Sequence, residues 1–241
     1  TTWGTTSTTA LTLNIPANSK VYLRGTNTAI GSMYIDSSNK FSSTGNVRCG
    51  GSISSLLIND HNPLTDLTGH DYAYKGTFRG MTTLLNSPEL PATKLSNHCY
   101  LQMFDHCTSL TVAPELPAQT LTNLCYNGMF EGCTSLKTIP DLKFTTAGLR
   151  SCTHMFYGCT SLISAPELHA TTLDEYCYNY MFYGCTSLKN TPSTLPATTL
   201  AENCYSYMFY DCTALESVPS NLLPATNLAD RCYGGMFYQC R

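Results

Sequence analysis

The fold is decided by a short stretch that recurs along the chain, and its clearest copy is Cys177-Tyr178-Asn179-Tyr180-Met181-Phe182-Tyr183-Gly184-Cys185-Thr186-Ser187-Leu188. The central string Met-Phe-x-x-Cys starts at Met103, Met129, Met155, Met181, Met208 and Met236, with spacings of 26, 26, 26, 27 and 28 residues. A degenerate copy starts at Thr77, with Phe78 in place and Met81 where Cys is expected. The chain therefore carries seven copies of one unit, and the last copy is truncated.

Other positions keep the same period. A leucine follows each copy of the string, at Leu84, Leu110, Leu136, Leu162, Leu188 and Leu215. Prolines come four residues later, at Pro88, Pro114, Pro140, Pro166, Pro192 and Pro219. A second leucine column is Leu95, Leu121, Leu149, Leu173, Leu200 and Leu228. A period of about 20–29 residues with recurrent Leu is typical of a solenoid with one strand and one short helix per turn. One such unit cannot bury its apolar face alone, so successive units must stack.

The unit also predicts local structure. A helix is expected over residues 173–183, because Leu173, Cys177 and Met181 would share one helical face. Residues 186–191 then read as a short extended segment. The sequence therefore predicts an α/β solenoid with one short strand and one short helix in each turn of about 26 residues.

Residues 1–66 lack the repeat. Residues 10–15 and 20–24 alternate apolar and polar side chains, and residues 47–53 are a third strand candidate. Solenoid ends expose apolar core, which a cap with a polar outer face covers. We therefore expect a β-rich N-terminal cap over residues 1–66 and the repeats over residues 67–241.

The columns Cys-Tyr-x-x-Met-Phe-x-x-Cys-Thr-Ser-Leu-x-x-x-Pro resemble the BspA-like leucine-rich repeats, whose motif is Ile-Gly-x-x-Ala-Phe-x-x-Cys-x-x-Leu before a strand that ends in Pro. Phe182, Cys185 and Leu188 match directly, whereas Cys177 and Met181 stand at the Ile and Ala positions. The units here are longer than the family's roughly 23 residues, so each turn must carry an extra loop. The stretch from Asn46 to Ile53 also looks like the region before such repeats in surface proteins of gut Bacteroidetes. The resemblance implies a leucine-rich-repeat right-handed superhelix in a secreted or surface-attached bacterial adhesion protein without catalytic residues.

Composition excludes several classes of function. Charged residues are 12 % of the chain and the net charge is −3, so the basic stripe that nucleic acid binding needs is missing. No apolar stretch approaches the roughly 18–20 residues of a membrane span. Residues 1–4 do not form a signal peptide, which we interpret as processing or truncation upstream. No nucleophile elbow or phosphate-binding glycine loop occurs, so we expect no enzyme activity and no cofactor.

Twelve of the 13 cysteines fall into two columns. The first column is Cys99, Cys125, Cys152, Cys177, Cys204 and Cys232. The second column is Cys107, Cys133, Cys159, Cys185, Cys212 and Cys240. We favour buried thiols, because cysteines eight residues apart on a helix are roughly 12 Å apart. Disulfides remain the alternative, supported by the joint loss of both cysteines in the first copy. Zinc is disfavoured, because the spacing is too long and no His column accompanies the cysteines.

The candidate binding residues lie on two faces of the expected turn. Exposed tyrosines follow or precede Met-Phe, at Tyr157, Tyr183, Tyr210, Tyr238, Tyr180 and Tyr207. Variable residues on the strand side include Lys137, Lys189 and Glu216. Aromatic rings with free hydroxyls suit contact with proteins or sugars, although they can also simply pack between turns and stiffen the rod. The sequence therefore predicts a non-catalytic extracellular module that binds a protein or glycan. The alternatives are a structural or phage-associated scaffold and a carbohydrate-binding part of a larger secreted protein.

Overall fold

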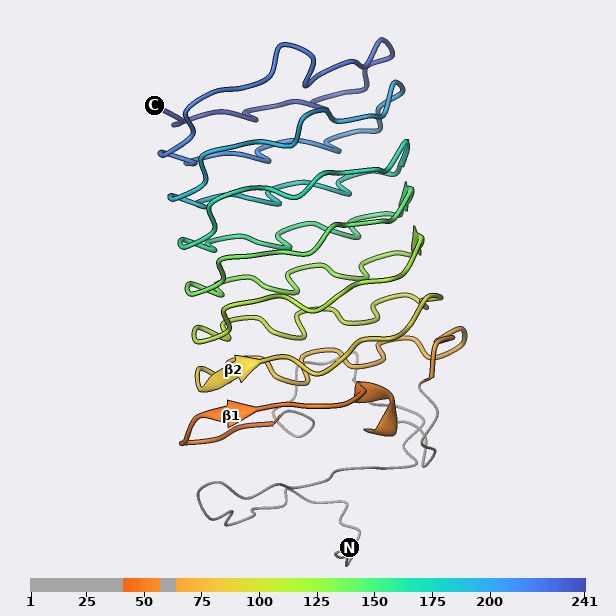
Figure 1. The fold of residues 1–241 in the computed structure, drawn as a ribbon. Helices are drawn as coiled ribbons and strands as arrows, with labels where there is room; N and C mark the ends of the chain where they lie inside the picture. Colours follow the sequence, from red (N-terminus) through yellow and green to blue (C-terminus); the bar gives the residue numbers. More distant parts are fainter. Residues whose placement is uncertain (1–40, 57–63) are drawn as a thin grey trace, which may run out of the picture.

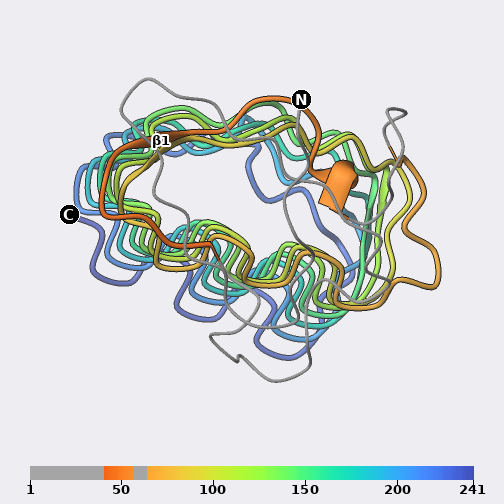
Figure 2. The same ribbon diagram turned by 90° about the horizontal axis from the view of Figure 1, so that it is seen from below.

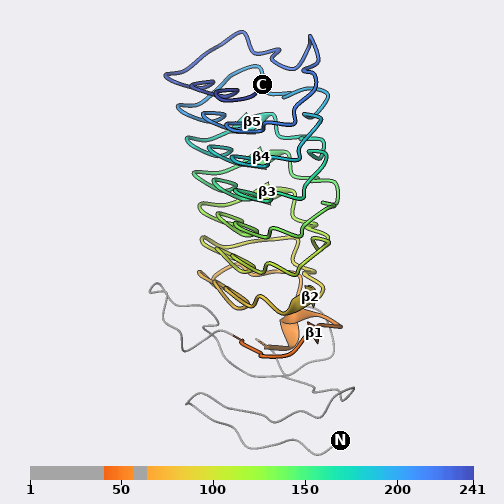
Figure 3. The same cartoon turned by 90° about the vertical axis from the view of Figure 1, so that its left-hand side faces the viewer.

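The chain forms a straight stack of similar coils. In the computed structural model, which describes residues 41–56 and 64–241, each coil lies directly on the previous one (Figure 1). Seen from the side, the coils follow one another in a row with only a small sideways drift toward the C-terminal end (Figure 3). The prediction of a repeat solenoid is confirmed.

Regular elements are few and short. The strands are β1 (Val47–Arg48), β2 (Leu84–Asn86), β3 (Thr120–Leu121), β4 (Thr146–Ala147) and β5 (Thr172–Leu173), and one 3-10 helix, η2, spans Ile53–Leu56. β1 pairs with β2, and β3, β4 and β5 form a three-stranded sheet, all in parallel. Isolated parallel bridges such as Val112 to Thr138 and Ser164 to Asn190 join further coils. Each pairing joins equivalent positions of neighbouring coils, which is the register of a solenoid.

The expected helix over residues 173–183 is wrong. In residues 41–56 and 64–241, the segments around Met-Phe contain consecutive turns and no α-helix. The N–H groups of Met181 and Tyr183 donate to carbonyls three residues earlier, at 3.2 Å. The N–H groups of Phe182 and Gly184 donate instead to carbonyls of the next coil, at 2.9 and 2.8 Å. The backbone N–H groups of alternate residues thus donate within the coil and to the next coil. The i to i−4 hydrogen bonds that define an α-helix are not formed in this segment.

This backbone repeats every four residues. Tyr176, Tyr180 and Gly184 have φ values of 56, 55 and 68°, in the left-handed region. Because a turn with positive φ at its third residue reverses the chain sharply, each four-residue step forms one scallop. Seen along the axis, the coil has a smooth long side that contains β1 and a scalloped long side opposite (Figure 2). On both long sides, backbone N–H groups donate directly to carbonyls of the neighbouring coil. The distance between neighbouring coils is therefore about the same on the two sides, and the stack does not curve.

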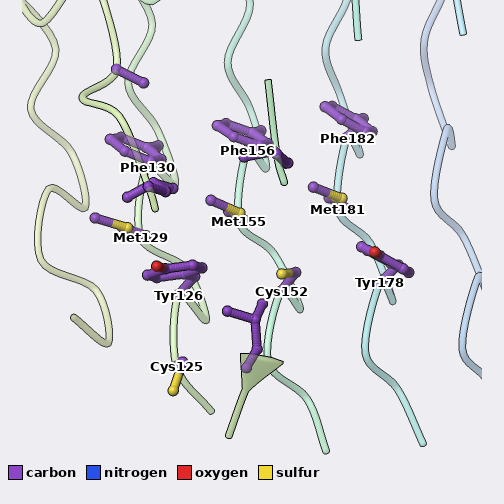
Figure 4. Packing of buried hydrophobic residues seen from close by; sticks show 14 of the residues in the cluster. Cys125, Tyr126, Met129, Phe130, Cys152, Met155, Phe156, Tyr178, Met181 and Phe182 are labelled. Atoms are coloured by element: carbon purple, nitrogen blue, oxygen red, sulfur yellow. The ribbon is translucent and has the colours of Figure 1, made fainter. Parts of the chain in front are cut away.

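The core lies between the two long sides and consists of columns of identical residues. Phenylalanine rings stack from Phe78 to Phe237 with centroids 5.5–5.6 Å apart. Methionines form a parallel column that is fully buried from Met103 to Met208. Figure 4 shows these columns in three successive coils, with Met129, Met155 and Met181 aligned. Each side chain therefore covers its own counterpart in the next coil.

A tyrosine column is interrupted in the fourth coil, which is the coil of Met155 when coils are counted from the first repeat at Thr77. Tyr178 and Tyr205 stack at 5.4 Å, but Cys152 occupies the equivalent place between Tyr126 and Tyr178 (Figure 4). The backbone agrees, because the N–H of Cys152 donates to the next coil as the N–H of Tyr178 does. Our alignment of Cys152 with the first cysteine column is therefore wrong by one residue, and Ser151 stands in that column.

A second substitution fills the space that this tyrosine leaves. Phe144 is fully buried and its ring lies 6.2 Å from that of Tyr178, whereas the neighbouring coils have Ala118 and Ala170 at this position. The coil is also smaller at Ala147, which pairs with Leu121 and with the leucine of β5. The predicted leucine column is thus wrong at Leu149. Large and small residues have changed places across the core of this coil, which keeps its packing density.

All 13 cysteines are free thiols in the structure. In the second column each thiol donates to the carbonyl of a phenylalanine one coil earlier, as Cys185 does to Phe156 at 3.2 Å. The same carbonyl accepts the N–H of Cys159 at 3.1 Å. Equivalent bonds of 3.0–3.2 Å recur in all six members of this column. A thiol suits this place because it is small and apolar and still supplies a donor for the second lone pair.

The third expected strand, residues 47–53, is part of the stack. β1 lies parallel to β2, Ser52 bridges Glu89, and the ring of Phe41 lies 5.4 Å from that of Phe78 at a tilt of 33°. Residues 41–53 therefore follow the path of a coil and cover the first repeat. The expected strands at 10–15 and 20–24 lie outside the described residues.

Candidate binding surface

Side chains on the scalloped side point inward and outward in pairs. Tyr178 and the adjacent Cys177 are buried, Tyr180 is half-buried, and Met181 and Phe182 are buried again. Tyr183 is the next outward residue. The four-residue turn therefore places one aromatic position before Met and another after Phe on the outside of every coil.

The outer position forms a ladder in the last four coils. The rings of Tyr157 and Tyr183 are 4.7 Å apart and those of Tyr183 and Tyr210 are 4.5 Å apart, with interplanar angles of 5° in both pairs. Tyr238 continues the ladder at 5.2 Å. Because each ring covers the face of the next, the ladder presents ring edges and hydroxyl groups to solvent.

A second ladder runs beside the first. The rings of Tyr180 and Tyr207 stack at 4.8 Å, and His154 lies 5.2 Å from Tyr180. Tilted contacts of 5.6 and 5.9 Å join Tyr180 to Tyr183 and Tyr207 to Tyr210. We call the connected set the aromatic patch; its members are His154, Tyr157, Tyr180, Tyr183, Tyr207, Tyr210 and Tyr238.

The second ladder is built on a strained backbone. Tyr180 and Tyr207 have φ values of 55 and 56°, a region that costs a side chain with a Cβ about 1–2 kcal/mol. Gly76 and Gly128 occupy the same place in other coils at φ 60 and 58° without that strain. Gln102 and His154 occupy this place in two further coils, at φ 52 and 56°, so side chains with a Cβ are accepted there and the backbone alone does not single out the tyrosines.

The aromatic patch is uncharged near neutral pH. Burial, together with the neighbouring ring of Tyr207, raises the pKa of Tyr180. Burial is also the largest cause of the raised pKa of Tyr183, followed by Tyr157 and the carboxylate of Asp211. Burial lowers the pKa of His154, so its imidazole is neutral at pH 7. A partner consequently meets neutral donors and acceptors, with the carboxylate of Asp211 beside them.

The first three coils carry charge at the position of the outer ladder. Arg79 pairs with Asp105 at 2.6 Å, and Asp105 also contacts His106 and is only 2 % exposed. Glu131 comes next, and burial followed by the charge of Asp105 raises its pKa. One surface thus changes from charged to aromatic along the stack, and sequence comparison of the same position in all coils would have revealed this.

Lys137, Lys189 and Glu216 do not join the aromatic patch. They lie on the smooth long side, where the N–H groups of Lys189 and Glu216 donate to the preceding coil at 2.8 and 3.2 Å. The side chains of Lys189 and Glu216 form an exposed ion pair, with 2.7 Å between Nζ and Oε1. The structure therefore divides the predicted residues into two surfaces, and the tyrosines alone form a continuous one. His154 belongs with these tyrosines, although the sequence did not indicate it.

Parallel coils with stacked core columns define the class of this protein as a repeat solenoid. Among solved structures it is similar to a leucine-rich repeat protein from Bacteroides ovatus ATCC 8483, with 21 % identity and a TM-score of 0.40. The match covers 68 % of this chain and 38 % of the other chain. No family profile and no curated protein matches the chain.

Residues 41–56 and 64–241 also bear on metal binding and on membrane insertion. No cluster of three His, Cys, Asp or Glu side chains is placed to hold a metal ion there. Within the same ranges, none of the helices has the length and apolar character needed to cross a membrane.

Proposed function

We propose that this solenoid is a non-catalytic binding module and that its partner contacts the aromatic patch. The observation that carries the proposal is the continuous, uncharged set of seven rings held on a rigid repeating backbone. Tyrosine is favoured at interfaces because it combines a large apolar area with a polar end and few rotatable bonds.

The proposed setting is outside the cell, on a bacterial surface or in secreted form, where the module adheres to a protein or glycan. The support is the low content of charged residues, 12 %, and the resemblance of residues 177–192 to the BspA-like repeats. A leucine-rich-repeat right-handed superhelix and the absence of catalytic activity belong to the same proposal.

A comparison of variants on the two long sides tests the site. The change Tyr183→Ala with Tyr210→Ala removes two central rings, whereas Ile163→Ser changes a residue of the smooth side that is 49 % exposed. Binding to a glycan array, to immobilised extracellular proteins and to whole cells is measured for each labelled protein. We expect the double variant to lose binding and Ile163→Ser to retain it. If circular dichroism shows both to be folded and the double variant binds as the original does, the aromatic patch is not the site.

A further inference from the structure

The aromatic patch has a geometry that restricts the chemistry of its partner. The rings of Tyr157, Tyr183 and Tyr210 stack at 4.5–4.7 Å, so their faces are covered by one another. A sugar ring cannot lie flat on a covered face. What these rings offer outward is a row of edges and hydroxyl groups, with one hydroxyl in each coil. Recognition here therefore depends on hydrogen bonds to a row of phenols.

The row repeats with the coil. A partner that makes a hydrogen bond to each successive ring must lie along the stack and offer a polar group at nearly the same distance. In an extended chain of β-1,4-linked pyranoses the advance per sugar is close to the roughly 4.8 Å between stacked backbones, and because successive sugars are turned over, hydroxyl groups from alternate edges of the chain face successive rings. Each sugar also offers several hydroxyl groups that act as donors and acceptors, as the phenol does. A second copy of this chain repeats at the same distance, so the area of the patch must decide between a polymer and a protein.

The area of the patch also favours a single polymer chain over a protein. A fully covered aromatic side chain buries about 150–250 Å², but most of these seven rings are already more than half covered. Only Tyr207 and Tyr238 are widely exposed, at 36 and 61 %. The patch thus presents on the order of 400 Å², about half of the ~800 Å² that each partner contributes to a stable protein interface. This area is too small for a dimer of this chain or for a protein partner that uses the patch alone.

Charge selects among polysaccharides. The patch itself is neutral, and Asp211 directly follows Tyr210 in the chain, so its carboxylate lies beside the outer ladder. The same carboxylate repels sulfated or uronic acid polymers, because like charges brought together without a cation are unfavourable. A neutral polymer meets no such opposition.

Resting on the proposed function, we propose that the aromatic patch binds a neutral, extended β-1,4-linked polysaccharide. The polymer lies along the stack with one sugar per coil and accepts and donates hydrogen bonds at Tyr157, Tyr183, Tyr210 and Tyr238. A chain of about four sugars covers the four rungs of the outer ladder, so affinity rises up to that length and then levels off.

The test uses the whole chain and isothermal titration calorimetry with defined ligands. These are cello-oligosaccharides and manno-oligosaccharides of two to six sugars, with α-linked malto-oligosaccharides and oligogalacturonate as controls. The decisive variant is Tyr157→Phe with Tyr183→Phe and Tyr210→Phe, which keeps the stacked rings and removes the hydroxyl groups. Lys189→Ala on the smooth side is the matched control. We expect the triple variant to weaken binding of a β-1,4-linked tetrasaccharide by about tenfold or more, and the control to leave it unchanged.

The outcomes separate this inference from the proposed function. Unchanged affinity in the triple Phe variant, or equal affinity for the α-linked series, overturns recognition through the hydroxyl row. If no neutral β-1,4-linked ligand binds but a protein or cell surface does so in a manner that Tyr183→Ala with Tyr210→Ala abolishes, the ligand class is wrong and the binding surface stands. Sedimentation that shows a dimer lost in that double variant also overturns the ligand class. Binding that is indifferent to both sets of variants overturns both proposals.

Discussion

The exchange of side chains in the fourth coil gives the sharpest test of the packing. Phe144→Ala removes a fully buried ring that lies 6.2 Å from the ring of Tyr178. Within the same coil, Cys152 and Ala147 stand where other coils have tyrosine and leucine, so these two positions have no large side chain to move into the space. We therefore expect the upper part of the range for such truncations, about 4–5 kcal/mol of unfolding free energy.

The compensating change is Cys152→Tyr. Alone, it adds a second ring where Phe144 already lies, and overpacking of this kind costs about 1–3 kcal/mol. Together with Phe144→Ala it recreates the arrangement of the adjacent coils, with a small residue as at Ala118 and a tyrosine between Tyr126 and its next counterpart. The double variant should therefore be more stable than Phe144→Ala, with an interaction energy of about 2–3 kcal/mol, at the upper end for residues in contact.

Urea denaturation followed by circular dichroism measures all four members of this cycle, and the m-value shows whether each unfolds as the original does. Phe104→Ala combined with Cys152→Tyr is the control, because those residues lie two coils apart and their effects should add. If the effects of Phe144→Ala and Cys152→Tyr also add, the two side chains do not share one space and the explanation of the fourth coil is refuted.

Three other predictions concern the backbone, the titration of the patch and the cysteines. Gly148→Ala places a Cβ 2.7 Å from the carbonyl oxygen of Leu121 and should destabilise the chain by about 1–3 kcal/mol in the same assay. Burial lowers the pKa of His154, so the unfolded chain binds its proton first and stability falls as the pH drops below about 6.5. His154→Gln should reduce the fall in Tm between about pH 7 and pH 5. A thiol titration without reductant should find all 13 cysteines reactive after unfolding, while in the folded chain the half-buried Cys49 and Cys240 react first.

Each of these predictions has a result that contradicts it. Gly50→Ala is the matched control for the glycine, since nothing lies within 4 Å of its added Cβ, and an equal loss in both variants would rule out the clash. An unchanged slope of Tm against pH in His154→Gln would assign the acid sensitivity to other groups. Fewer than 13 reactive thiols in the unfolded, unreduced chain would show that disulfides form.

The sequence predicted the stack because its period is a property of the whole chain. Residues that recur every 26–28 positions must occupy equivalent places, whatever the local backbone. The buried Met, Phe and second Cys columns follow directly, as does the outward direction of Tyr183. In three of the four coils of the outer ladder, the residue before Met is a histidine or a tyrosine (His154, Tyr180 and Tyr207). Comparing this position between coils would therefore also have predicted the second ladder.

The local backbone was not predictable from apolar spacing alone. Leu173, Cys177 and Met181 recur every four residues, and this spacing fits a helix of 3.6 residues per turn as well as a chain of four-residue turns. The difference lies in the adjacent residue, because Tyr178 and Phe182 are buried beside Cys177 and Met181, whereas neighbours on a helix point about 100° apart. A pair of adjacent buried residues that recurs every four positions is the pattern that identifies these turns.

The errors in the fourth coil have a different origin. Cys152 and Leu149 were assigned to columns by residue type, but backbone pairing places Ser151 and Ala147 there. Packing is conserved as a sum across the core rather than position by position, since a larger residue on one side can replace a smaller one on the other. One sequence shows the residues but not which of them share a space.

The equal advance of the scalloped and smooth sides has a consequence for how such a molecule can change. In a curved solenoid, every added unit turns the end of the molecule into a new direction and alters the concave surface. Here a duplication or loss of one 26-residue unit lengthens or shortens the rod along a single line. Neighbouring rungs keep their separation and orientation, so the reach of the protein can vary by recombination between copies while the groups it displays remain in the same mutual arrangement.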